Sequence, residues 1–446
     1  MKYAVFAIAA AGTLPLSILL YVDRRFVKYA IWAMVAAMCA YTATSINFYS
    51  DEEYRGSARG MEVSAIHLMA FAVLAAAALR RRLKPVPDIG YFIYTVYFLL
   101  CLPSLSTAAD GLIAWYEIWK MIMLYASSLA VFAYLEGGGK VRGLVAAFAC
   151  FSIVNAAVVV KQHFGGMYQA RGVFPHQNCM TMAMSLLAPV FLAVYLQGGL
   201  RGRFRKLCAA AFLCALLSIA WSYSRGGVVA APAGCAVTVF AFFLKGARRG
   251  KTCLRLLPLF LAALAGIAAV LPRIVERFEK APEASANTRV EFARCAWEMI
   301  KDEPVTGVGI NNWGIKINAP YEYATRAGRT LNYAEGYKDG IVETVYLLVC
   351  AECGIPALVA MLAWFLRYLV LCVVLSKKLS GTYYAAIPAG LAGGLVACYL
   401  QSFLEWVLRQ QMNLILLMVF FALLDHLAAN VSRLKNETKT KGSGNV

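Results

Sequence analysis

Apolar runs of about twenty residues follow one another along most of the chain, separated by short polar breaks. A run of this length spans the hydrocarbon core of a bilayer as one α-helix. The pattern therefore predicts an all-α polytopic membrane protein with about 12–13 transmembrane helices, depending on whether the first run is re-entrant. The runs lie at 3–21, 26–47, 61–79, 89–107, 111–135, 143–160, 179–197, 207–222, 227–244, 254–271, 354–375, 382–404 and 412–428.

One polar break is much longer than the others. It extends from Pro272 to Gly340, is rich in charged and aromatic residues, and carries a helical pattern of its own. A membrane protein that keeps one folded segment on one side is expected to work on that side. We therefore expect helices over 1–271, a loop over the active site at 272–340, further helices over 341–430, and a polar tail at 431–446 that is predicted to be disordered.

Two segments of the long loop indicate contact with the membrane or with a ligand. Residues 287–300 carry apolar side chains at helical spacing, and Val290, Ala293, Trp297 and Ile300 are expected to form one face of an amphipathic helix. The tract 320–337 holds four tyrosines. Aromatic rings with polar tips suit sugar rings, but they also occur at membrane interfaces in general, so both interpretations stay open.

Charge and composition set the topology and the class of partner. Hydrophobic residues make up 61% of the chain, which excludes a soluble domain of this size. The formal net charge of +19 could indicate nucleic acid, but the basic residues lie in short turns on alternate breaks. Such turns face the cytoplasm and meet anionic headgroups, so we expect membrane lipids as partners and no nucleic acid. The outward breaks are then 48–60, 107–110, 161–178, 222–226, 272–340 and 405–411.

Two arginines in these outward breaks are candidates for binding phosphate. Arg171 lies in the segment 169–178 that leads into a helix, with His176 and Asn178 close by, and Arg225 lies between two apolar runs. An arginine at bilayer depth faces a partner or a water-filled cavity. One guanidinium group can bind two phosphate oxygens at once through parallel hydrogen bonds. The alternative is that each side chain reaches the phosphates of lipid headgroups.

Carboxylates at the same face are candidates for proton transfer. Glu343 begins an apolar helix where the long loop meets the membrane. It could act as a general base. The alternative is a capping role, in which the helix dipole stabilises its negative charge. Glu405 and Arg409, in the last outward break, are further candidates. Glu117 and Lys120 lie within one run, and we expect them to pair in a structural role.

Neither cofactors nor metals are indicated by the sequence. No His, Cys or carboxylate cluster occurs at ligand spacing. The thirteen cysteines lie almost entirely inside the apolar runs, and Cys350 and Cys353 are expected to be small buried side chains without a redox role.

Five short motifs, in order around the long loop, resemble the O-antigen ligase/polymerase family of bacterial membrane glycosyltransferases. They are the Arg171–Asn178 loop, Ser224-Arg225, the segment Arg289 to Trp297, the Pro304–Gly309 turn, and the segment Tyr346 to Gly354. The resemblance covers about residues 140–430. It implies a GT-C-like helical fold in the inner membrane and transfer of a glycan from a polyprenyl (undecaprenyl) diphosphate carrier to an acceptor hydroxyl on the periplasmic side, without a metal.

The family's functional positions carry over residue by residue. The resemblance implies that Arg171 and Arg225 hold the donor diphosphate. Where ligases usually have a histidine, this chain has Glu343, so we expect that carboxylate to be the base. This departure favours an O-antigen or exopolysaccharide polymerase over a ligase that uses a lipid A-core acceptor. We expect the substrates to contact His176, Asn178, Ser224, Arg289, Tyr346, Glu405 and Arg409.

Two other classes stay open from the sequence. A lipid or solute transporter also accounts for charges within the membrane, but it predicts functional groups near the midplane, whereas the candidates here lie in outward breaks. A structural scaffold would have no need of Arg225 at that depth.

Overall fold

Helices occupy twelve of the thirteen predicted apolar runs in the computed structural model, which describes residues 2–80, 89–197, 202–244, 254, 256–257, 272, 275, 283–329 and 340–443. The predicted run 254–271 lies almost entirely outside the described residues. Within them, ten helices are long and apolar enough to cross a membrane, and the segments Ala65–Leu79 and Ile89–Leu105 are shorter apolar helices. The chain is therefore an all-α polytopic membrane protein, as predicted.

The helices are α1 (Lys2–Val22), α2 (Val27–Ala37), α3 (Tyr41–Thr44), α4 (Ala65–Leu79), α5 (Ile89–Cys101), α6 (Gly111–Glu136), α7 (Val141–Phe164), α8 (Gln177–Leu196), α9 (Arg203–Ser222), α10 (Arg225–Leu244), α12 (Glu283–Asp302), α13 (Trp313–Lys316), α14 (Tyr323–Arg326), α15 (Val345–Lys378), α16 (Ala386–Gln401), α17 (Gln411–Ala429) and α18 (Val431–Ser443). Short 3-10 helices lie at Arg24–Phe26, Met38–Ala40, Leu102–Leu105, Tyr383–Ala385 and Val407–Arg409.

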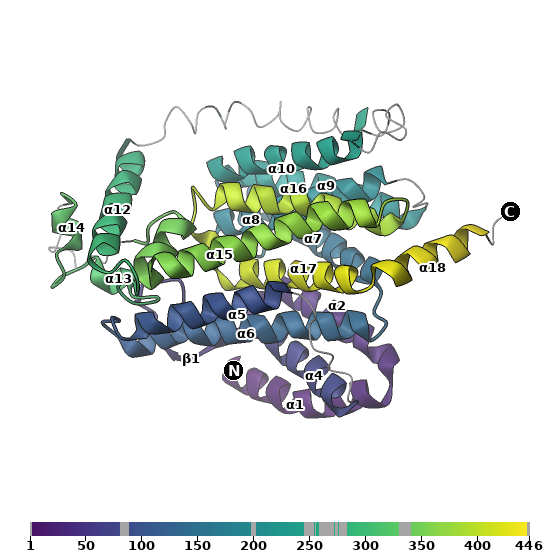
Figure 1. The fold of residues 1–446 in the computed structure, drawn as a ribbon, viewed down its shortest axis with the longest axis horizontal. Helices are drawn as coiled ribbons and strands as arrows, with labels where there is room; N and C mark the ends of the chain where they lie inside the picture. The colour runs from purple at the N-terminus through teal and green to yellow at the C-terminus, as the bar shows by residue number, and fades with distance from the viewer. Residues whose placement is uncertain are drawn as a thin grey trace.

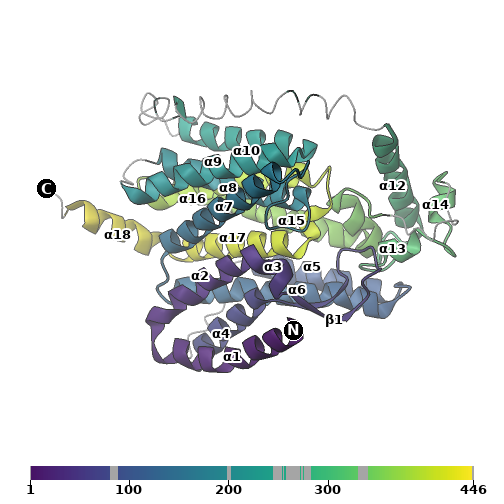
Figure 2. The same cartoon turned by 180° about the vertical axis from the view of Figure 1, so that it is seen from behind.

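The long helices run side by side, while α12, α13 and α14 gather at one end of the bundle (Figures 1 and 2). α8 and α16 pack closely in the interior because glycines face the contact. A Cβ atom added to Gly390 would lie 2.5 Å from the Cα of Val190, and one added to Gly394 would lie 2.4 Å from the carbonyl oxygen of Leu186. Small residues allow transmembrane helices to approach in this way.

The predicted break at Gly354 is confirmed as a kink inside α15. Gly354 has φ 82° and ψ 170°, a conformation that favours glycine. The predicted turn at residues 303–309 packs into this kink, where the amide of Val308 donates to the carbonyl of Ala351 (2.9 Å) and the amide of Ile355 donates to the carbonyl of Pro304 (2.8 Å). The kink therefore fastens the long loop to the membrane helices.

A β-hairpin was not predicted. The run expected at 26–47 ends as a helix at Thr44, and β1 (Ile46–Ser50) then pairs antiparallel with β2 (Gly60–Val63). The indole of Trp119 on α6 donates to the backbone oxygen of Glu62 (3.1 Å) and so holds the hairpin against the bundle. The hairpin lies at the same end as α12–α14 (Figure 2).

Two further expectations need correction. The buried side of α12 consists of Phe292, Cys295, Ala296, Met299 and Ile300. Of the predicted face, Ile300 is therefore buried, whereas Val290 is 53% exposed and Trp297 56% exposed. Apolar residues occur on more than one side of this helix, so spacing alone did not select the buried side. The tail predicted to be disordered contains α18, where Leu434 is buried against the bundle.

Candidate functional site

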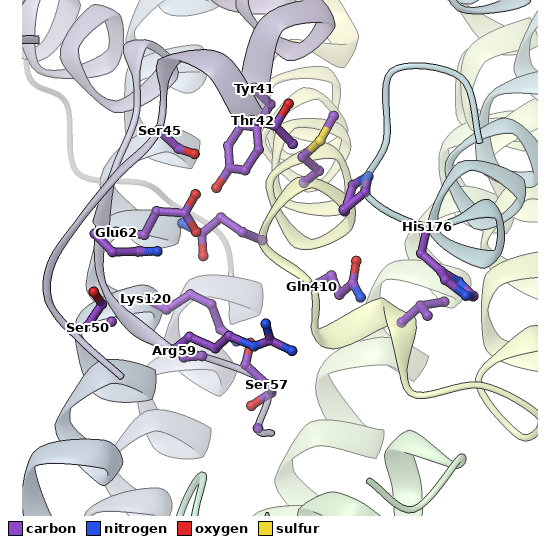
Figure 3. Close-up of a pocket in the computed structure, with 18 of the residues that line it drawn as sticks. Tyr41, Thr42, Ser45, Ser50, Ser57, Arg59, Glu62, Lys120, His176 and Gln410 are labelled. Carbon is purple, nitrogen blue, oxygen red and sulfur yellow. The ribbon is translucent and has the colours of Figure 1, made fainter. Parts of the chain in front are cut away.

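A cavity of about 810 Å³ opens where the outward loops meet. Its walls come from six separate parts of the chain: Tyr3 of α1, the segment 41–62 with the hairpin, Lys120 of α6, residues 175–178 at the start of α8, Glu343 before α15, and the segment 405–412. Figure 3 shows polar side chains of the hairpin side, among them Ser45, Glu62 and Arg59, on one side of the cavity and His176 on the other. Of the predicted site residues, this cavity is lined by His176, Asn178, Glu343 and Glu405.

The loop that carries Arg171 is held by two amides of α7. The side-chain oxygen of Gln162 accepts from the backbone N–H of Arg171 (2.9 Å) and of Gly172 (2.8 Å), and Asn155 accepts from the N–H of Val173 (3.1 Å). The Arg171 guanidinium is exposed and donates to the carbonyl of Pro175 (3.1 Å). Because Pro175 lines the cavity, this arginine lies at its rim.

His176 caps the N-terminus of α8. Its Nδ1 accepts from the backbone N–H of Asn178 (3.2 Å), which requires that nitrogen to be unprotonated. Desolvation and the neighbouring charge of Arg171 both lower the pKa of His176 from its ordinary value of 6.5. The imidazole of His176 is therefore an uncharged part of the cavity wall at pH 7.

Glu405 is a buried carboxylate of the cavity whose pKa is strongly raised. It is 6% exposed, and its Oε2 accepts from the side-chain amide of Asn178 (2.5 Å). Burial raises the pKa of Glu405 to about 7, with a further rise from the charge of Glu343 and opposing effects from Arg289 and Arg225. A carboxyl group that titrates near neutral pH can accept or donate a proton under working conditions.

Glu343 lies just before the N-cap residue Thr344, not within the first turn of α15. Its carboxylate forms an ion pair with Arg289 of α12, the helix at the end of the bundle (Figure 1). Both side chains are about one-third exposed, at 34% for Arg289 and 37% for Glu343. The loop helix thus supplies the cation that pairs with Glu343, a residue of the cavity wall.

Arg225 is the first residue of α10, directly after the cap residue Ser224. The Ser224 hydroxyl accepts from the N–H of Gly227 (3.4 Å) and is buried, so it shapes the helix start and does not line the cavity. Arg225 is near enough to Glu405 to favour its ionised form. In the part of the chain that the structure describes, no hydrogen bond or ion pair of its side chain is found.

Tyr346 and Arg409 do not line the cavity and have structural contacts elsewhere. Tyr346 donates to the carbonyl of Tyr399 (2.9 Å). Arg409 is buried between Glu117 (2.9 Å) and Glu352 (2.6 Å). Glu117 also pairs with Lys120 (2.5 Å), which confirms the pair predicted within that helix. Arg409 therefore belongs to a buried ion-pair network that joins α6, α15 and the loop before α17.

The hairpin side of the cavity was missed by the sequence reasoning. The signal available was the polar break at 48–60, which was assigned to the outer face without a structure of its own. Residues of this side include Tyr41, Ser45, Asn47, Ser50, Ser57 and Glu62. As for metals, no group of three or more His, Cys, Asp or Glu side chains is placed as ligands among the described residues.

The fold and the cavity define a multi-pass membrane protein whose polar site lies where its loops meet. Residues 210–362 match the model of the family described as O-antigen ligase. This segment of the chain is thus similar to the O-antigen ligase family, and the match supports a membrane glycan-transfer function in O-antigen assembly. A comparison with curated proteins found no match.

The matched segment contains only part of the candidate site. It includes Arg225, Arg289 and Glu343, but it ends before Glu405 and begins after Arg171. The hairpin also lies outside it. The cavity is therefore assembled from the family domain together with chain segments on both sides of it.

Proposed function

We propose that the protein transfers a glycan from a polyprenyl diphosphate carrier to an acceptor sugar hydroxyl on the periplasmic side of the bacterial inner membrane. One observation carries the proposal: two carboxylates of a polar cavity, Glu343 and Glu405, lie beside Arg225 and Arg289. A third arginine, Arg171, lies beside His176 of the same cavity. A transporter would need such groups near the middle of the bilayer, whereas these gather where the loops meet.

The arginines have the role of holding the donor diphosphate. In the reaction the acceptor oxygen forms a bond to the anomeric carbon of the donor, and the bond from that carbon to the diphosphate oxygen breaks. Negative charge then builds on the leaving diphosphate. Arg171 and Arg225 stabilise it without a change of protonation, since guanidinium stays charged. We propose that this chemistry requires no metal.

Glu405 is the carboxylate that suits the proton transfer best. The acceptor hydroxyl loses its proton as the new bond forms, and an effective base has a pKa near the working pH. Glu405 has a pKa of about 7 and no ion-pair partner within 4 Å among the described residues, whereas Glu343 is paired with Arg289. We therefore assign to Glu405 the role of the base that takes the proton from the acceptor hydroxyl. We assign to Glu343 and Arg289 the role of positioning the acceptor.

Polymerase and ligase differ only in the acceptor. The replacement of the usual ligase histidine by Glu343 favours a polymerase that extends a lipid-linked glycan. The description of the matched family as O-antigen ligase favours the second candidate, transfer to lipid A-core. Offering each acceptor separately to the purified protein decides between them.

The arginine clamp is tested by Arg225→Ala and Arg225→Lys in the purified protein, with a polyprenyl-diphosphate-linked oligosaccharide as donor. We expect Arg225→Ala to lose transfer by at least 100-fold, as for the removal of one charge-stabilising donor. Arg225→Lys should retain only part of the transfer activity, because an ammonium group cannot bind two phosphate oxygens in the bidentate geometry of a guanidinium. Arg294→Ala, an exposed arginine of α12, is the matched control. Full product from Arg225→Ala, at normal protein level, would disprove the clamp.

A further inference from the structure

We propose that the part of the cavity beneath the hairpin binds an oligosaccharide without net negative charge, which is either the acceptor glycan or the glycan of the donor. The residues concerned, here called the hairpin wall, are Tyr41, Ser45, Asn47, Ser50, Ser57 and Glu62. This inference rests on the proposed transfer function and names the class of ligand that its cavity accepts.

A β-bulge in β1 places two side chains of the hairpin wall on the side that faces the cavity. Phe48 is opposite Met61 and Ser50 is opposite Gly60, so Tyr49 is an extra residue in β1. Side chains alternate along a regular strand, and Asn47 and Ser50 would then point to opposite faces. The extra residue returns Ser50 to the side of Asn47, and both line the cavity. Tyr49 accepts a left-handed φ of 49° for this, a strained conformation that is typical of functional sites.

The charges of the cavity differ from those of the whole chain. The chain has 43 Lys and Arg against 24 Asp and Glu. The described residues that line the cavity include four carboxylates and only two such basic residues: Glu52, Glu62, Glu343 and Glu405 against Arg59 and Lys120. Lys120 is neutralised by Glu117 behind the wall. Glu343 is likewise paired with Arg289, so the acidic groups nearest the hairpin are Glu52 and Glu62. An acidic sugar would meet like charge there, whereas a hydroxyl-rich neutral ligand would not, and the donor diphosphate belongs at the rim beside Arg171 and Arg225.

The wall offers the groups that sugar hydroxyls need. Hydroxyl and amide side chains both donate and accept, as sugar hydroxyls do. Gln411 also lines the cavity and is only 7% exposed. One end of its amide contacts Nε2 of His67 (3.1 Å), and the buried other end has no partner in the part of the chain that the structure describes. A buried polar group without a partner is costly, and a ligand hydrogen bond would satisfy it.

The hairpin loop is fixed in place by the family domain. The side chain of Asn311 accepts from the amide of Ala58 (3.1 Å) and the hydroxyl of Ser57 (3.1 Å), and it donates to the carbonyls of Ala58 (2.8 Å) and Ile113 (2.8 Å). Asn311 is fully buried. The wall is thus held before any ligand binds, and a site held in this way loses little entropy on binding.

The test compares two hairpin variants with wild type in full-length protein in nanodiscs. Asn47→Ala/Ser50→Ala removes polar groups, and Ser50→Trp fills the space. Glu53→Ala is the control, because Glu53 is exposed in the same loop and does not line the cavity. The KM of the polyprenyl-diphosphate-linked donor and of an acceptor oligosaccharide on an alkyl chain are measured separately. Saturation-transfer NMR with the free oligosaccharide, with and without pyrophosphate, follows binding without catalysis.

We expect each variant to raise the KM of one substrate roughly ten-fold, the loss that corresponds to two hydrogen bonds, with kcat within about two-fold. If the KM of the donor rises, the hairpin wall binds the glycan of the donor; if the KM of the acceptor rises, it binds the acceptor glycan. The NMR signal should weaken in both variants and persist with pyrophosphate. Unchanged KM values and NMR signals in both folded variants would overturn the inference. If wild type transfers nothing, the proposed function fails, while the NMR comparison still decides whether the hairpin wall binds sugar.

Discussion

Glu405→Gln should stabilise the protein above neutral pH and change little in acid. Glutamine keeps the shape of the side chain and an oxygen that can accept from Asn178, so the substitution removes the ionisable group and little else. In the fold, burial raises the pKa of Glu405 from 4.5 to about 7. The folded protein therefore favours the protonated carboxyl more than the unfolded chain does.

The sign and size follow from this difference. Below pH 4.5 the carboxyl is protonated in both states, and the shift has no effect on stability. As pH rises from 4.5 through 7, the unfolded chain loses its proton first, and stability falls. Above pH 7 the full cost is present, about 3 kcal/mol for a pKa raised from 4.5 to about 7. Glu405→Gln lacks this cost, which corresponds to a Tm higher by on the order of 5 °C at pH 8.5.

The assay is thermal unfolding of the detergent-purified protein by intrinsic tryptophan fluorescence, at one heating rate, from pH 4.5 to pH 8.5. Wild type and Glu405→Gln should unfold together at the acid end and separate progressively through pH 7. Asn178→Ala provides a second check, because loss of the hydrogen bond to Glu405 should raise the pKa of Glu405 further. Equal Tm differences at both ends of the range would refute a raised pKa for Glu405.

Three further predictions concern the surroundings of the cavity. Arg409→Ala should lower the free energy of unfolding by about 3–5 kcal/mol, because it leaves Glu117 and Glu352 without their shared cation, and thermal unfolding checks this. Asn311→Ala should make the loop 51–59 more sensitive to protease, whereas wild-type sensitivity would contradict its clamping role; Asn311→Gly, which tolerates the φ of 56°, isolates the lost hydrogen bonds. If Glu405 is the base, transfer by wild type should rise with pH through about 7, and Glu405→Gln should show low transfer with no such rise.

The placement of the site followed from topology read in the sequence. Apolar runs of bilayer length fix where the chain crosses, and basic turns on alternate breaks sort the remaining breaks onto one face. Parts of the cavity wall come from the breaks 48–60, 161–178 and 405–411, which were assigned to that face, and from Glu343 just after the break 272–340. Other lining residues, such as Tyr41, Asn47 and Glu62, lie in the predicted apolar runs. Arg171, Glu343 and Glu405, which are far apart in the chain, could thus be expected at one face from the sequence, whereas the hairpin side could not.

Pairing between distant segments could not be expected in the same way. The hairpin forms only because β1 and β2 pair across the intervening loop. A strand of five residues has too weak a pattern of polar and apolar positions to predict that pairing. Arg409 in an outward break looked like a ligand-binding group, but three-dimensional packing gives it two buried carboxylate partners. The pKa of Glu405 depends on burial and on Glu343, Arg289 and Arg225 from other segments, so no local pattern carries it.

The most direct test of the central claim is a transfer reaction with purified wild-type protein in nanodiscs and a polyprenyl-diphosphate-linked oligosaccharide, followed by gel and mass spectrometry with and without chelator. The account predicts a ladder of longer lipid-linked glycans, or transfer to lipid A-core when that acceptor is offered, unchanged by chelator. No product with either acceptor, together with movement of the lipid across the bilayer, would contradict the account and indicate a transporter.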